Sequence, residues 1–168
     1  MTMPTDLLER ANEAGIRLEI VRGVPMWEAQ PVVRHQRSID RIRRSLVAPK
    51  VSPLADDTPC SCIDIADIYV KFPDGSFKRP DVSIFCREPE ELDEAVTQIP
   101  AAVIEVISKG YEAKDLDIGP NFYLMHGVRD VIVFDPHTLV VHHYRKDGFD
   151  RLISPVQIKL ACGCIATV

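Results

Sequence analysis

The sequence predicts an α/β domain in which a mixed, curved β-sheet is flanked by α-helices. Apolar runs typical of buried strands alternate along the chain with segments that have the apolar spacing of amphipathic helices. Turn signals, such as Pro73-Asp74-Gly75 and Lys146-Asp147-Gly148, separate neighbouring strands. A chain of 168 residues suits a single core, so we expect one domain over residues 1–168.

The first part of the chain predicts two helices separated by a hairpin. Residues 5–14 form a short helix that ends at Gly15. Residues 17–21 and 24–28 are expected to pair around Gly23. Residues 34–47 have the pattern of an amphipathic helix, which Pro49 ends.

The rest of the chain predicts strands around one further helix. The acidic segment 87–98 lacks clear periodicity and is expected to be a solvated loop or a short helix. A helix is expected over 112–126, either broken or delayed by Gly119-Pro120. The expected strands cover residues 62–70, 77–85, 101–107, 131–134, 139–144 and 151–158.

The composition is that of an ordinary globular protein, with 46% hydrophobic and 27% charged residues. A formal net charge of -5 argues against a purely electrostatic nucleic-acid binder, although an enzyme can contact DNA through one local basic patch. No apolar run reaches the roughly 18 residues of a membrane helix. The N-terminus lacks the regions of a signal peptide, so a cytoplasmic protein is expected.

Five cysteines, an odd number in a chain without a secretion signal, favour free thiols. They include two Cys-x-Cys pairs, Cys60/Cys62 and Cys162/Cys164. Four thiolates would bind zinc if the two pairs met in space. Buried or edge thiols without a metal are the alternative.

Two carboxylates interrupt runs that otherwise have the character of buried strands. Asp81 begins the run 81–85, and Glu105 lies inside the run 101–107. A carboxylate in a buried strand is costly unless something compensates it, and two on neighbouring strands repel each other. A cation between them removes both penalties. The pair therefore predicts a divalent metal site, a kind of site that often acts on phosphates.

Short segments in order along the chain resemble the PD-(D/E)XK nuclease superfamily, in the bacterial branch described as "putative restriction endonucleases". The resemblance spans about residues 16–144. The matching segments are Arg17–Gly23, Arg34-His35-Gln36, Asp74-Gly75-Ser76, Arg79–Ser83, Glu105-Val106-Ile107-Ser108, Asp115, Tyr123, Gly127-Val128 and Val133–Pro136. The resemblance implies a restriction-endonuclease-like core.

The same resemblance implies a metal-dependent DNA endonuclease that hydrolyses phosphodiester bonds. Asp81 and Glu105 would bind Mg2+ or Mn2+, with the carbonyl of Val106 as a further ligand. Glu19 is the candidate for a third carboxylate. Tyr123 is more typical of a core residue than of a catalytic one.

The sequence departs from the family pattern at its lysine. The family usually has a lysine four residues after the aspartate at position 115, where this chain has Gly119. The wider superfamily has it two residues after the glutamate, where this chain has Ile107. Lys109 and Lys114 lie nearby, and we assign the catalytic role to Lys114. The alternative is a catalytically degenerate relative that acts as a nucleic-acid- or protein-binding module.

A basic stripe on the helix 34–47 is the candidate DNA contact. Arg34, Arg37 and Arg41 recur at steps of three and four, so they share one helix face, which could follow a phosphate backbone or be solvated surface. His35 either lines the site or caps the helix. A homodimer is plausible, because cutting both DNA strands usually requires two sites.

Overall fold

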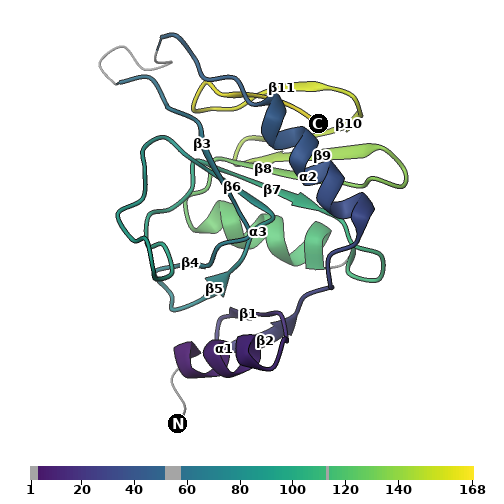
Figure 1. The fold of residues 1–168 in the computed structure, drawn as a ribbon. Helices are drawn as coiled ribbons and strands as arrows, with labels where there is room; N and C mark the ends of the chain where they lie inside the picture. Colours follow the sequence, from purple (N-terminus) through teal and green to yellow (C-terminus); the bar gives the residue numbers. More distant parts are fainter. Residues whose placement is uncertain (1–3, 52–57, 113) are drawn as a thin grey trace.

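In the computed structural model, which describes residues 4–51, 58–112 and 114–168, helices surround a six-stranded sheet and a smaller four-stranded sheet (Figure 1). The helices are α1 (Pro4–Glu13), α2 (Val33–Ser45), a π-helical turn η1 (Lys114–Ile118) and α3 (Gly119–Met125). The strands are β1 (Leu18–Val21), β2 (Val24–Trp27), β3 (Ile63–Ala66), β4 (Val70–Lys71), β5 (Phe77–Lys78), β6 (Val82–Phe85), β7 (Ala102–Val106), β8 (Asp130–Phe134), β9 (Val140–Arg145), β10 (Gly148–Ile153), β11 (Gln157–Lys159) and β12 (Ile165–Thr167). The expected α/β fold is confirmed.

The six-stranded sheet has the order β10-β9-β8-β7-β6-β3. Strands β7 and β8 are parallel and are joined through η1 and α3, whereas the other neighbouring strands are antiparallel. Every residue of β6, β7 and β8 is buried. Because both faces of these central strands are covered, they have continuous apolar runs rather than alternating ones.

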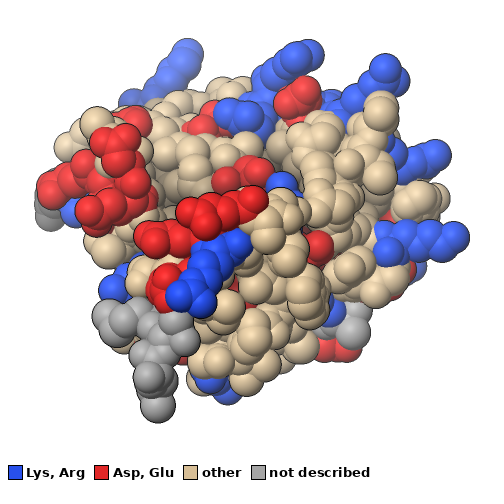
Figure 2. All heavy atoms as spheres, turned by 60° about the horizontal axis from the view of Figure 1, so that its bottom comes forward, with Lys and Arg blue, Asp and Glu red and all other residues tan. Residues whose placement is uncertain are grey.

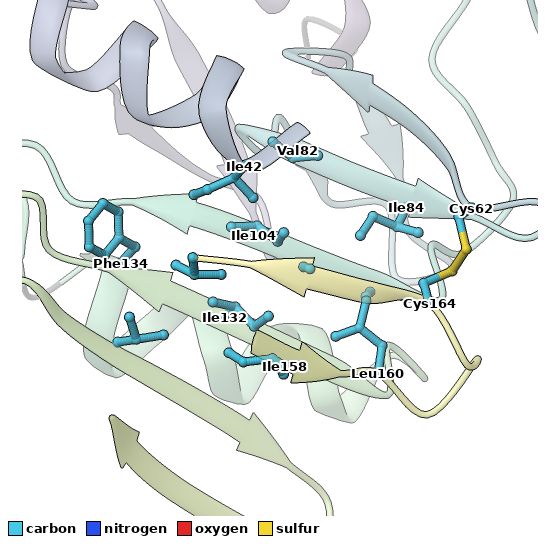
Figure 3. Close-up of a cluster of buried hydrophobic side chains, with 14 of the residues drawn as sticks. Ile42, Cys62, Val82, Ile84, Ile104, Ile132, Phe134, Ile158, Leu160 and Cys164 are labelled. Carbon is cyan, nitrogen blue, oxygen red and sulfur yellow. A yellow bond between two sulfur atoms is a disulfide. The ribbon is translucent and has the colours of Figure 1, made fainter. Parts of the chain in front are cut away.

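The two faces of this sheet pack against different elements. On one face, Ile42 of α2 and the β11–β12 hairpin pack against Val82, Ile104 and Ile132 (Figure 3). On the other face, α3 packs against residues of alternate parity, including Val103. Figure 1 shows α2 and the β11–β12 hairpin on one side of the sheet and α3 on the other.

The four-stranded sheet has the order β2-β1-β5-β4 and lies beside the first. Helix α1 covers it with Leu8 and Ala11, which pack against Leu18, Ile20 and Phe77. The expected hairpin is confirmed, because β1 pairs antiparallel with β2. Its first strand also pairs with β5, through Ile20 opposite Phe77.

Two long strands expected from the sequence are each broken into two. Residues 62–70 divide into β3 and β4, because Asp67 has a left-handed backbone with φ 60°. Residues 77–85 divide into β5 and β6 at Pro80, which has no N–H for a strand ladder. In each case one part joins the small sheet and the other joins the large sheet.

The C-terminal prediction is wrong in detail. The expected strand 151–158 spans the end of β10, the turn at Ser154-Pro155 and the start of β11, and β12 was not predicted. The expected helix 112–126 consists of η1 followed by α3.

Within the described ranges, no helix is long and apolar enough to cross a membrane.

The cysteines also differ from expectation. Disulfides join Cys60 to Cys86 and Cys62 to Cys164, whereas Cys162 is free and buried. The expectation of free thiols is therefore wrong for four of the five. The two Cys-x-Cys pairs do meet in space, as the zinc alternative required.

Asp130 should contribute strongly to stability. Its fully buried carboxylate faces Nε2 of His143 at 2.8 Å and accepts a hydrogen bond of 2.8 Å from the N–H of Ala161. Asp130→Ala leaves both groups unpaired, so we expect the free energy of unfolding to fall by about 3 kcal/mol in urea denaturation followed by circular dichroism. Asp147→Ala, at a side chain that is 91% exposed, should change it little. Equal urea midpoints for the two variants would contradict this role.

Candidate active site

Two neighbouring strands of the large sheet bring the predicted acids together. Asp81 directly precedes β6, and Glu105 lies near the end of β7. Strands β6 and β7 are antiparallel with Val82 opposite Ile104, so the same register places Asp81 opposite Glu105. Glu105 has the parity of Val103 and therefore faces the α3 side of the sheet.

Hydrogen bonds fix both carboxylates. Glu105 Oε2 accepts a bond of 3.1 Å from the N–H of Asp81, and Asp81 Oδ2 accepts one of 2.7 Å from the N–H of Val106. The hydroxyl of Tyr123 on α3 donates to Glu105 Oε1 over 2.7 Å. Nε2 of His35 on α2 lies 3.1 Å from Asp81 Oδ2. The acids therefore occupy defined positions between two helices.

Asp81 and Glu105 line a cavity of about 30 Å3, which has room for about two water-sized groups. His35, Val106 and Lys114, which the sequence predicted, also line it. The remaining lining residues are Arg17, Glu28, Ala29, Pro31, Ser108, Tyr111 and Asp115. The structure thus brings most of the predicted site residues to one place.

The cavity concentrates negative charge. Burial raises the pKa of Glu105 well above its usual value, and the charges of Asp81 and Asp115 raise it further. Burial also raises the pKa of Asp115 to about 6, with repulsion from Asp81 opposing the favourable effect of Lys114. Raised carboxyl pKa values mean that these acids would gain from a nearby cation.

Glu19 lies beside this cavity in an ion-pair network. Its carboxylate is fully buried and accepts hydrogen bonds of 2.8 Å from Lys78 Nζ and from the N–H of Arg79. Lys114 Nζ lies 3.1 Å away. Burial alone would raise the pKa of Glu19, but the charges of Lys78 and Lys114 outweigh it and lower the pKa to about 2.

Lys114 connects the network to the cavity. Its ammonium group lies 3.5 Å from Glu28 as well as 3.1 Å from Glu19. Burial lowers the pKa of Lys114, but the nearby carboxylates, led by Glu19 and Glu28, raise it above its usual value. Burial and the charge of Glu19 raise the pKa of Glu28 to about 7. Lys114 is therefore a cation held beside the acidic cavity.

The two positions where a lysine was expected hold no side chain that could replace it. Ile107 is buried in the apolar core on the α3 side. Gly119 is the first residue of α3, and a Cβ added there would lie 3.2 Å from the carbonyl oxygen of Lys114 and 3.9 Å from Cε2 of Tyr123. Position 119 thus lies against the backbone of Lys114 and close to the ring of Tyr123.

The predicted DNA-contact residues divide into two places. Arg34, Arg37 and Arg41 line a concave surface of about 570 Å3, separate from the acidic cavity. The other residues that line it are Val33, Ser38, Phe134, Pro136 and Leu139. The guanidinium of Arg41 lies 5.4 Å from the centre of the Phe134 ring. His35 instead lines the acidic cavity.

The face formed by α1 and the β1–β2 hairpin differs from this basic surface. Figure 2 shows that acidic and basic side chains are intermingled there, and that many Lys and Arg side chains project from the edge. Among the described residues drawn in Figure 2, no continuous basic patch that would match a phosphate backbone is visible on this face.

Sequence reasoning missed two charged residues of the site, Lys78 and Glu28. Lys78 had a usable signal, because it is a charged residue within a segment expected to be a buried strand. Glu28 had no such signal, since it follows an exposed strand of the hairpin. The positions of both depend on how the small sheet packs against the large one.

The fold is similar to that of a solved structure, described as a "putative nuclease" belonging to DUF820, from Anabaena variabilis. The TM-score is 0.61 with 16% sequence identity, and the match covers 87% of this chain and 83% of that chain. A search of curated proteins found no match. The sequence profile of the Uma2 family, described as "putative restriction endonuclease", matches residues 4–160. The chain therefore belongs to the Uma2 family.

Proposed function

We propose that this protein is a metal-dependent DNA endonuclease that hydrolyses phosphodiester bonds in the cavity around Asp81 and Glu105. One observation carries the proposal. The two carboxylates are fixed by hydrogen bonds on neighbouring strands, and burial together with mutual repulsion raises the pKa of Glu105. A cation would relieve both costs. The family description and the fold of the Anabaena protein agree with a nuclease.

The donor atoms fit Mg2+ or Mn2+. The carboxylates of Asp81 and Glu105 and the carbonyl oxygen of Val106 are hard oxygen ligands. Among the described residues, sets of three side-chain ligand atoms within 4.8 Å of one another occur only among the cysteines. An ion at Asp81 and Glu105 would therefore complete its shell with backbone oxygen and water, as Mg2+ usually does.

We assign to Asp115, rather than to Glu19, the role of a carboxylate that contacts the ion through a bound water. Asp115 lines the cavity, and burial together with the charge of Asp81 raises its pKa to about 6. Both oxygens of Glu19 are already engaged by Lys78 and the N–H of Arg79. In this proposal Glu19 is a positioning residue that holds the two lysines beside the cavity.

The residues around the cavity have distinct roles in hydrolysis. A bound metal ion would polarise the phosphate and lower the pKa of an attacking water. Lys114 would offset the negative charge that develops on the phosphate. Tyr123 and His35 hold Glu105 and Asp81 in place through their hydrogen bonds.

The concave surface lined by Arg34, Arg37 and Arg41 is the proposed contact with the DNA backbone. Its arginines lie on α2, the helix whose His35 reaches into the acidic cavity. DNA held along this helix would therefore pass close to the cavity. A homodimer would supply the second site needed to cut both strands.

The two acids should be essential for cleavage. We expect Asp81→Asn and Glu105→Gln to cleave no plasmid above the metal-free background in Mg2+ or Mn2+, because each removes negative charge from the proposed metal ligands. Asp93→Asn, at an exposed position outside the cavity, is the control and should cut like the natural chain. Equal cleavage by all four proteins would show that the acids have no catalytic role.

Because Ile107 and Gly119 stand where a lysine was expected, a second candidate function is a module that binds DNA without cutting it. The same proteins distinguish it. If none cuts across a wide range of metals, calorimetry detects no Mg2+ or Mn2+ binding and DNA binding persists, the protein is a binding module rather than a nuclease.

Lys114 should be the lysine that supports cleavage. We expect Lys114→Met to reduce the single-turnover cleavage rate by at least about 100-fold, because the variant removes the cation beside the cavity. Lys109→Met is the matched control, since Lys109 is exposed and does not line the cavity. A larger loss with Lys109→Met than with Lys114→Met would reverse the assignment.

Glu19 and Lys78 should be energetically coupled. We expect Glu19→Gln and Lys78→Met each to lower the free energy of unfolding by about 3–5 kcal/mol, because each leaves a buried charge without a partner. The double variant should lose less than the sum, by at least about 1 kcal/mol in urea denaturation. The exposed pair Asp6 and Arg10, changed to Asn and Met, should show coupling within about 0.5 kcal/mol. Additive losses at Glu19 and Lys78 would mean that their ion pair is not formed.

A further inference from the structure

All five cysteines of the chain converge at one end of the large sheet. Cys60 and Cys62 precede β3, and Cys86 follows β6, the strand paired with β3. Cys162 and Cys164 lie in the turn between β11 and β12. Three segments that are distant in the sequence therefore supply the sulfur atoms.

The sulfur atoms form two overlapping sets of three. Those of Cys60, Cys62 and Cys164 lie within 4.8 Å of one another, and so do those of Cys60, Cys86 and Cys162. Cys60 belongs to both sets, and its Sγ lies 3.6 Å from that of Cys164. In the structure four of these atoms are paired in two disulfides, one of which Figure 3 shows at the edge of the core.

We propose that the reduced chain binds one Zn2+ ion in this cluster, through Cys60, Cys62, Cys164 and a fourth thiolate from Cys86 or Cys162. A zinc ion with sulfur ligands at about 2.3 Å in a tetrahedron holds neighbouring sulfurs about 3.8 Å apart. The 3.6 Å between Cys60 and Cys164 is close to that spacing. Two disulfides do not require their sulfur atoms to lie close to one another or to a fifth thiol, whereas a zinc ion requires four sulfur ligands at one place.

The surroundings suit a structural zinc site. Cys60, Cys62, Cys162 and Cys164 are each less than a tenth exposed, so water has little access to the ion. The tight turn at Gly163, with φ 95°, brings Cys162 and Cys164 to the same end of the hairpin. Thiolates are soft ligands that favour zinc over Mg2+, so this site is chemically distinct from the acidic cavity.

Zinc binding to this cluster requires that both disulfides are first reduced. A phosphine reductant takes an oxygen atom from water and supplies two electrons to each disulfide, which becomes two thiols. Four thiols then bind one Zn2+ and release four protons. The ion replaces the Cys62–Cys164 disulfide as the link between the β3–β6 edge and the β11–β12 hairpin, so its binding contributes to the stability of the fold.

Metal analysis of the full chain tests the proposal. The protein is purified under a phosphine reductant from cells supplied with zinc. We expect one zinc per chain, and five thiols after denaturation and chelation. Replacement of zinc by Co2+ should give the thiolate charge-transfer absorption and the visible bands of a tetrahedral site. Cys60→Ser combined with Cys164→Ser should reduce zinc from one equivalent to none, whereas Ser61→Ala, at the exposed residue between Cys60 and Cys62, should retain it.

Alkylation of the cysteines in the natural chain tests for bound zinc without any variant, so the result does not depend on whether the variants fold. Bound zinc should protect Cys60, Cys62 and Cys164 from alkylation, and the fourth protected cysteine identifies the remaining ligand. The proposal is overturned if the reduced chain binds no zinc or if the double variant retains zinc. It is also overturned if the disulfides persist under the reductant without zinc, or if alkylation is equal with and without zinc. None of these results depends on nuclease activity.

Discussion

The buried carboxylate of Glu105 is the constraint on which the rest of the site depends. Strand β7 lies inside the sheet with both faces covered, so a charge on it has little access to water. The structure meets this cost with two donors, the hydroxyl of Tyr123 and the N–H of Asp81. The first donor ties α3 to β7, and the second ties the start of β6 to it. Asp81 is thereby held beside Glu105, and the two repelling charges meet at one cavity. The position of α3 and the register of β6 on β7 therefore supply the two hydrogen bonds that offset the cost of burying the Glu105 carboxylate.

The small sheet supplies the positive charge that this arrangement needs. Lys78 comes from β5, and Glu19 from β1, its partner strand. Their ion pair of 2.8 Å is fully buried, and the ammonium group of Lys114 contacts the same oxygen of Glu19, Oε2, at 3.1 Å. A buried ion pair contributes little net stability compared with an apolar pair, because both charges lose their hydration. Its value here is positional, since it orients Glu19 so that Lys114 stays beside Asp115 and Glu105. The small sheet is thus best understood as the support for the cations of the site.

The sequence predicted the parts of the site that depend on local pattern. Asp81 and Glu105 stand out because each is a charge in an apolar run, and a strand register is enough to bring them together. Glu28 and Lys78 depend on contacts between segments far apart in the chain, such as Ile20 opposite Phe77, which no local pattern reveals. The two broken strands also depend on the packing of the two sheets. The chain bends at Asp67 and at Pro80, so that one part of each apolar run joins the large sheet and the other joins the small sheet. The strand β12 was missed because it has only three residues, so alternation along it carries little information.

The π-helical turn η1 places the backbone of Lys114 next to position 119, where the resemblance led us to expect a lysine. Hydrogen bonding from residue i to i+5 widens the turn, and it places the carbonyl of Lys114 beside Gly119, the first residue of α3. The carbonyl of Lys114 would then be only 3.2 Å from a Cβ at position 119, closer than an ordinary contact. A lysine at 119 would therefore crowd this turn, and glycine fits it. Glycine at 119 is therefore compatible with this turn, and the ammonium group of Lys114 lies 3.1 Å from Glu19 and 3.5 Å from Glu28.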